Sequence, residues 1–197
     1  DLVDNVCIEI VNGRHPVVED SLEKEGINFT PNDCFMHSKN STWVMTGPNM
    51  AGKSTFLRQT AIIVLLNQIG CFVPSDSAKL SIFDKIFTRI GASDNLSQGM
   101  STFMTEMVET SRIINEATSS SLVILDELGR GTSTEDGLAI ARAVLEFIVQ
   151  EIRCITLFAT HYKELCILSE KFNVIKPKTL QIKKWNEEII FLYKVIE

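Results

Sequence analysis

A glycine-rich segment, "GPNMAGKS" at Gly47–Ser54, carries the first pattern with a defined chemistry. It fits the spacing G-x-x-x-x-G-K-[ST], in which backbone N–H groups and the start of a helix surround phosphate groups. Gly47 and Gly52 allow backbone angles that a Cβ would hinder. We expect Lys53 to reach the β- and γ-phosphates of a nucleotide and the Ser54 hydroxyl to hold Mg²⁺. A plain glycine turn is the alternative; the apolar strand before the loop and the apolar-faced helix after it argue against that alternative.

Two adjacent carboxylates follow another apolar stretch, "LVILDE", which ends in Asp126 and Glu127. A buried parallel strand would carry both to the carboxyl edge of a sheet, where open α/β folds bind ligands. There Asp126 would hold the Mg²⁺ shell, partly through water, and Glu127 would orient or deprotonate the attacking water. The alternative role for the pair is capping of the next helix.

Two further residues are candidates with open alternatives. His161 follows the apolar stretch "TLFAT" and either caps or packs locally, or senses the γ-phosphate or the attacking water. Phe29 either stacks on the nucleotide base or is a core aromatic. His15 and His37 have no comparable context and are assigned to the surface or to packing.

Hydrophobic periodicity predicts the elements that must position these residues. Expected strands are 6–12, 15–18, 42–46, 85–90, 121–127, 154–160, 179–185 and 189–196, the last two as a hairpin with its turn near "NEE". Expected helices are 55–69, 101–117, 132–150 and 161–170, the third with Thr132 and Glu135 at capping-box spacing. Residues 21–41 form a polar connection. Strands alternating with helices predict one α/β domain with a mostly parallel sheet and right-handed crossovers.

Composition narrows the class of protein. The 197 residues are 45% hydrophobic, so a sizeable core is expected, and the net charge of −6 argues against a domain whose main task is gripping nucleic acid. The lysines near the C-terminus form a solvated face rather than a nucleic-acid patch: Lys176, Lys178, Lys183 and Lys184. The five cysteines have no CxxC spacing, which favours reduced thiols in a cytosol-like compartment and no zinc site. The longest apolar stretch is interrupted by polar residues, so no membrane span is expected.

Together the motifs "TGPNMAGKSTFLRQ", "FTRIGASDNL", "STFMTEM", "DELGRGTSTEDG" and "TLFATHY" closely resemble the ATPase domain of the MutS family of DNA mismatch-repair proteins. The resemblance implies a P-loop NTPase fold of the ABC type, with a mostly parallel central sheet flanked by helices, over residues 1–197. It implies hydrolysis of ATP to ADP and phosphate with Mg²⁺ at a dimer interface. Because the chain begins with Asp1, it is expected to be a piece of a longer protein. The resemblance implies mismatch-binding, connector, lever and clamp regions before it and a dimerisation element after it.

The resemblance also implies roles for individual residues. Glu127, Lys53 and His161 are the implied catalytic residues, and Ser54 and Asp126 are implied to bind the metal. Phe29 matches the aromatic that stacks on adenine, and Ser101, at a polar helix start, matches the serine that reaches the partner's γ-phosphate. Nucleotide contacts fall to the loop and the residue after it, namely Gly47, Pro48, Asn49, Met50, Ala51, Gly52, Lys53, Ser54 and Thr55.

Partners follow from the same resemblance. A second MutS-type subunit, as a homodimer, mismatched double-stranded DNA bound through other domains, and a MutL-type protein are implied, and no membrane. The cytoplasm of a bacterium is implied, or the mitochondrion or nucleus of a eukaryote. "AGKST" and "GTST" look more like the bacterial or organellar branch than like meiotic-recombination or recombination-suppressing homologues, which are the alternative. Two further hypotheses are a nucleotide-gated DNA clamp that hydrolysis only resets, and a transporter- or recombination-type ABC ATPase. "STFMTEM" at the position of a transporter's LSGGQ-like helix start argues against the latter.

Overall fold

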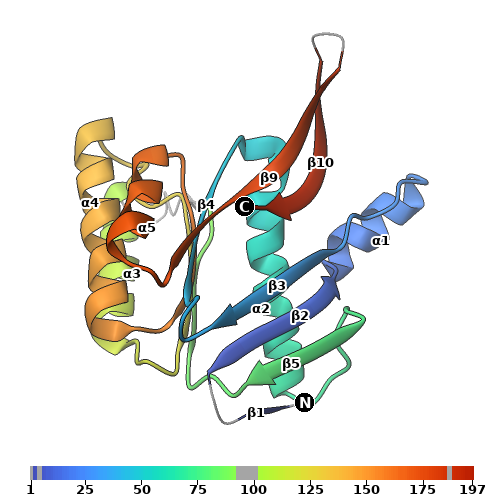
Figure 1. The fold of residues 1–197 in the computed structure, drawn as a ribbon, viewed down its shortest axis with the longest axis horizontal. Helices are drawn as coiled ribbons and strands as arrows, with labels where there is room; N and C mark the ends of the chain where they lie inside the picture. The colour runs from blue at the N-terminus through green and yellow to red at the C-terminus, as the bar shows by residue number, and fades with distance from the viewer. Residues whose placement is uncertain (1, 4–5, 92–101, 186–187) are drawn as a thin grey trace.

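The structure is a computed structural model that describes residues 2–3, 6–91, 102–185 and 188–197. Its strands form two sheets (Figure 1), a larger one ordered β10-β9-β4-β8-β7-β6 and a smaller one ordered β1-β5-β2-β3. The strands are β1 Leu2–Val3, β2 Cys7–Gly13, β3 Asn32–His37, β4 Thr42–Thr46, β5 Ser77–Ser81, β6 Ile86–Arg89, β7 Leu122–Asp126, β8 Ile155–Ala159, β9 Ile175–Trp185 and β10 Glu188–Ile196.

Helices lie on both faces of the larger sheet. They are α1 Pro16–Lys24, α2 Lys53–Gln68, α3 Thr102–Glu116, α4 Thr134–Phe147 and α5 Leu168–Lys171, with shorter segments η1 Asn49–Ala51, η3 Ile148–Ile152 and η4 Lys163–Ile167. Figure 1 shows α3, α4 and α5 grouped together, with α2 on the side of the smaller sheet. The larger sheet is therefore a central layer.

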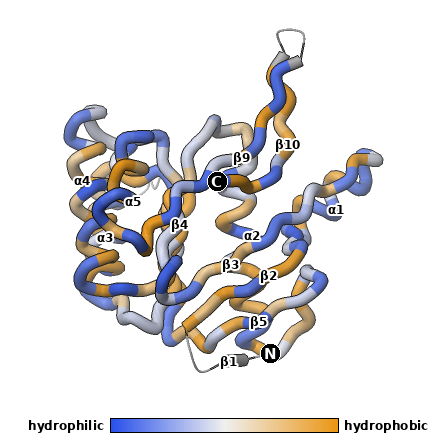
Figure 2. The backbone as a smooth tube through the Cα atoms, in the orientation of Figure 1, coloured by the Kyte–Doolittle hydropathy of each residue, from blue (hydrophilic) through white to orange (hydrophobic). Residues whose placement is uncertain are grey.

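Alternating side chains of the buried strands fill both faces of this layer. Toward α2 and the smaller sheet, Ile124 and Leu157 belong to one core with Leu57. Toward α4, Val123 and Phe158 belong to a second core. Hydrophobic stretches also run along β2 and β10 (Figure 2). Strands β4, β7 and β8 pair in parallel, so their carboxyl ends lie at one edge of the sheet. The two cores fix this edge from both faces.

The predicted fold class, an ABC-type P-loop NTPase with one mostly parallel central sheet, is wrong for this chain. The described residues form two sheets and both are mixed: β10 is antiparallel to β9, and β2 is antiparallel to both β3 and β5. The strands β1, β3 and β5 were not predicted. In β3 the buried apolar residues Cys34 and Met36 flank an exposed Phe35, which hides the apolar–polar alternation typical of a strand, and in β5 Leu80 is the one large apolar residue.

Local differences also have physical causes. The segment "HPVV", predicted as a strand, begins α1, because His15 Nδ1 accepts the Val18 N–H at 3.4 Å and Pro16 occupies the first turn. Helix α4 is capped by Ser133, which accepts from Asp136 N at 3.2 Å, one residue after the predicted Thr132. The predicted strands at the glycine loop and the carboxylates, and the C-terminal hairpin, are confirmed, while the turn residues 186–187 lie outside the described residues.

Candidate functional site

The glycine-rich segment forms a tight loop between the buried strand β4 and α2. Gly47 has φ +129° and Gly52 has φ +97°, so both positions need glycine. A Cβ on Gly52 would also lie 3.2 Å from Cδ1 of Tyr193. The loop leads directly into α2 at Lys53, so the first N–H groups of a sixteen-residue helix face the loop. Backbone donors of this kind form an anion-binding concavity.

Lys53 lies inside this loop and is only 1% exposed. Its Nζ donates to the carbonyl oxygens of Gly47 and Pro48, the latter at 3.0 Å. Burial lowers the pKa of Lys53, opposed by the negative charges of Glu127 and Asp126. A cation buried on loop carbonyls beside two carboxylates is costly for the fold alone, and it suits a polyanionic ligand.

Asp126 ends β7 at the same edge and is 5% exposed. Its Oδ1 is buried without a hydrogen-bond partner among the residues described. Burial raises the pKa of Asp126, opposed by a hydrogen bond from Ser54 and by the charge of Lys53. The orphaned carboxylate oxygen beside a hydroxyl is the oxygen chemistry that Mg²⁺ prefers, so Ser54 and Asp126 fit the predicted metal.

Glu127 follows in a left-handed backbone conformation, φ +60°, which costs free energy for a residue with a Cβ and persists where surrounding contacts impose it. Its N–H donates to Ala159 O at 2.9 Å, which ties it to the end of β8. Its Oε1 lies 2.5 Å from His161 Nε2, and its Oε2 pairs with Arg130. The structure thus brings His161 and Glu127 together, as the sequence suggested for two neighbouring strand ends.

A cavity of about 380 Å³ opens beside these carboxylates. Asp126 and Glu127 line it together with Thr102, the first described residue of α3. Ser101, predicted to reach a partner's phosphate, lies outside the described residues. The remaining lining residues are Arg89, Gly91, Glu106, Arg130 and Gly131.

A second cavity of about 450 Å³ is lined in part by Met50 and Gly52 of the glycine loop. Phe29 lines it, half-buried, with Met50 and Thr55 from the loop and α2. Tyr193 lines it too, although the sequence analysis did not single that residue out. Its position depends on an irregularity in β10, where Tyr193 has φ +55° and the Asn32 amide donates to Tyr193 O at 2.8 Å. The sequence alone does not place Tyr193 beside Gly52, because the two residues meet only when β10 has joined the sheet.

The remaining predicted contact residues take simpler positions. Pro48 is exposed, Ala51 is buried, and the backbone of Asn49 lies in η1. Across the described ranges, no cluster of three or more His, Cys, Asp or Glu side chains is arranged for a metal ion. In the same ranges no helix has the length and apolarity to cross a membrane.

Comparison with known proteins gives the family. The model of MutS domain V matches residues 43–197. The chain is 54% identical over all its 197 residues to the DNA mismatch repair protein MutS of Orientia tsutsugamushi (strain Ikeda). It is 52% identical over 196 residues to the protein of that name from Rickettsia rickettsii (strain Sheila Smith). In each case the chain spans 22% of the relative's length. MutS domain V, with mixed sheets and helices, replaces the predicted ABC-type class, and the chain belongs to the MutS family of DNA mismatch repair proteins.

Proposed function

We propose that this chain binds ATP with Mg²⁺ and hydrolyses it to ADP and phosphate. The observation that carries the proposal is the buried Lys53 ammonium, held on the carbonyls of a glycine loop beside Asp126 and Glu127. Two glycines at positive φ shape this loop, and α2 starts at its end. This arrangement supports binding of a triphosphate by backbone N–H groups and one cation.

The proposed roles follow the geometry. Lys53 exchanges its loop carbonyls for the β- and γ-phosphate oxygens. Ser54 and Asp126 would hold Mg²⁺, whose charge would offset that of the phosphates. Glu127 orients a water and takes its proton as the water oxygen bonds to the γ-phosphorus and the bond to the β,γ-bridging oxygen breaks. His161, 2.5 Å from Glu127, holds that carboxylate in place.

The cavity between Phe29 and Tyr193 supports a site for the adenine base. It adjoins the glycine loop through Met50 and Gly52, and both rings line it. Aromatic faces on a half-buried pocket suit a flat heterocycle. The two cavities therefore support a nucleotide laid across the loop, with the base on one side and the γ-phosphate on the other.

For the whole protein we propose a role in DNA mismatch repair, since its relatives carry that name. A second MutS-type subunit, mismatched double-stranded DNA bound through other domains, and a MutL-type partner belong to this proposal, as does Ser101 reaching the partner's nucleotide. So do the single ATPase domain over residues 1–197, the bacterial or organellar branch and a cytoplasmic location. The named relatives from Orientia and Rickettsia favour the bacterial branch.

The test is turnover by a Glu127→Gln variant of the protein at its natural full length. Gln keeps the size of the side chain and removes the base, so we expect kcat to fall by about 100-fold or more while ATP affinity stays within about threefold. Glu164→Gln, an exposed acid beside the neighbouring loop, is the matched control and should leave both unchanged. If Glu127→Gln hydrolyses ATP at the wild-type rate, the role assigned to Glu127 is contradicted. If the wild type does not bind ATP, the proposed ATPase function is contradicted.

A further inference from the structure

A buried carboxylate on α3, Glu106, lies outside the roles assigned above. Its side chain is 2% exposed, whereas other acids of this helix, such as Glu109 and Glu116, are exposed. A buried carboxylate is costly unless a strong hydrogen bond compensates it. Glu106 Oε1 accepts the N–H of Gly129 at 2.6 Å, a short, charge-assisted bond to the loop after β7.

The same glycine is held from its other side. The Gly129 carbonyl accepts from the Tyr162 hydroxyl at 3.1 Å. Gly129 has φ +87°, and a Cβ there would lie 2.4 Å from the carbonyl oxygen of Gly137, the glycine in the first turns of α4. One residue of the loop is therefore fixed by α3, by α4 and by Tyr162, the residue that follows His161.

The loop around Gly129 is linked to both residues that pair with the Glu127 carboxylate, Arg130 and His161. Glu127 lies two residues before Gly129, and its partner Arg130 lies one residue after it. His161, the other partner, is joined to Tyr162 by a peptide bond. A shift of Gly129 therefore displaces Glu127, Arg130 or both, while Lys53 and the glycine loop are left in place.

Helix α3 also reaches the cavity beside the carboxylates. Thr102 and Glu106, one helical turn apart, line it together with Glu127. A ligand or partner group that contacts the start of α3 thus acts on the element that carries Glu106. The Glu106–Gly129 hydrogen bond links this helix directly to the loop of Glu127.

We propose that Glu106 is a positioning residue, which fixes Glu127 through the Gly129 N–H and couples the start of α3 to hydrolysis. The inference rests on the proposed ATPase function and deepens it. Glu106 need not touch the nucleotide. Its charge strengthens a hydrogen bond that holds the loop, so its loss should lower the rate of hydrolysis and leave binding of ATP intact.

The experiment compares Glu106→Ala with Glu106→Gln in the protein at its natural full length. Ala leaves the Gly129 N–H without a partner, and we expect kcat to fall by about 10- to 100-fold with the Kd for ATP within about threefold. Gln keeps a carbonyl oxygen that can accept the same N–H, so it should restore kcat to within about threefold of the wild type. Glu116→Gln removes a charge from the far end of α3 and should change neither constant.

A second readout follows the loop directly. Hydrogen exchange of a peptide spanning 127–131 should be faster in Glu106→Ala than in the wild type and unchanged in Glu116→Gln. If Glu106→Ala does not fold, Tyr162→Phe removes only the bond to the Gly129 carbonyl, and we expect a fall in kcat of about threefold at unchanged Kd.

The outcomes separate the two proposals. A wild type that turns over ATP and a folded Glu106→Ala with equal kcat would overturn the role of Glu106 alone. Equal losses of ATP affinity and kcat in Glu106→Ala would show that Glu106 has only a structural role. Unchanged hydrogen exchange of residues 127–131 in this variant would contradict a role of Glu106 in holding the loop. A wild type that does not hydrolyse ATP would overturn the proposed function itself.

Discussion

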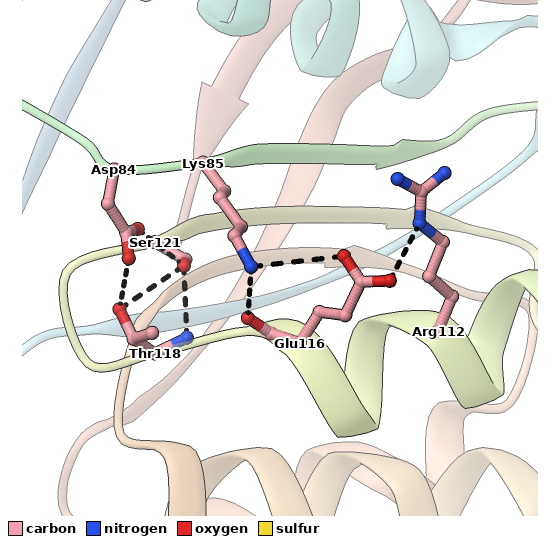
Figure 3. Close-up of polar contacts among 6 residues, drawn as sticks. All are labelled: Asp84, Lys85, Arg112, Glu116, Thr118 and Ser121. Atoms are coloured by element: carbon pink, nitrogen blue, oxygen red, sulfur yellow. Dashed lines mark hydrogen bonds and ion pairs between the residues drawn. The ribbon is translucent and has the colours of Figure 1, made fainter.

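At the amino end of the larger sheet, just before β6 and β7, polar side chains pair with one another (Figure 3). Asp84 accepts from the hydroxyls of Thr118 at 2.6 Å and Ser121 at 2.7 Å. Lys85 donates to the Glu116 carbonyl oxygen at 3.0 Å, and Arg112 Nε lies 3.1 Å from Glu116 Oε1. Each of these groups has a partner from the chain itself.

The carboxyl end of the larger sheet differs, because polar groups there are held buried or in an unfavourable backbone conformation. Asp126 has an orphaned buried oxygen, Lys53 is buried on backbone carbonyls, and Glu127 has a positive φ. Burial dominates the raised pKa of Asp126. At Asp84 burial also acts to raise the pKa, but the hydrogen bonds from Thr118 and Ser121 bring it below its usual value. At the amino edge, hydrogen bonds within the chain stabilise the polar groups. At the carboxyl edge, burial of polar groups costs free energy of folding that a bound ligand would offset.

The largest expected effect contrasts two lysines. Lys53→Met removes the buried cation, so we expect ATP affinity to fall by about 100-fold or more, since a buried charge–charge contact is lost. Lys85→Met at the amino edge should leave ATP affinity within about twofold, because its partners are exposed. Equilibrium titration with a fluorescent ATP analogue measures both, and similar losses in the two variants would break the contrast between the edges.

The next effect concerns stability at the carboxyl edge. Because the pKa of Asp126 is raised in the folded state, its charge destabilises the fold as pH rises above the ordinary value of 3.8. At pH 7 we expect Asp126→Asn to be more stable by about 1 kcal/mol, with a melting temperature about 2–4 °C higher. Below the unfolded-state pKa the two proteins should melt together. Calorimetry at several pH values checks this.

Asp84→Asn should have the opposite sign. The folded-state pKa of Asp84 is lowered, so its charge stabilises the fold above the unfolded-state pKa, and this stability is lost as pH falls through the folded-state value. The group is exposed, so we expect a loss of about 0.5–1 kcal/mol at pH 7 and no change in ATP binding. Higher stability in this variant would contradict a closed network at the amino edge.

The smallest effect is expected at the rim of that network. Arg112 is 71% exposed and pairs with Glu116 four residues later on α3. Surface pairs of this spacing contribute about 0.3–0.5 kcal/mol, so Arg112→Gln should lower the melting temperature by about 1 °C. High salt should remove the difference, and a loss that persists in 1 M salt would mean that Arg112 packs rather than pairs.

Local patterns in the sequence were sufficient to predict the glycine loop, the strand ending in Asp126 and the neighbouring His161. Each is a short motif attached to an apolar strand, and such strands are buried on both faces. Glu106 was not found, since its spacing on α3 gives no sign that a carboxylate would lie under Gly129. Tyr193 was missed for a similar reason, because it reaches Gly52 only through a bulge held by Asn32. The smaller sheet depends on pairings between distant segments, β2 with β3 and β5, which local propensity does not specify.

Thermal unfolding of the wild type and Asp126→Asn, with and without Mg²⁺-ATP, tests most directly whether the carboxyl edge is organised for a nucleotide. Without nucleotide we expect the variant to melt higher. With Mg²⁺-ATP at about 100 times its Kd, the wild type should gain about 2.7 kcal/mol and the variant much less, so that their order reverses. A variant that melts lower without nucleotide, or an equal gain in both proteins, would contradict the assignment of Asp126 to a Mg²⁺-nucleotide site.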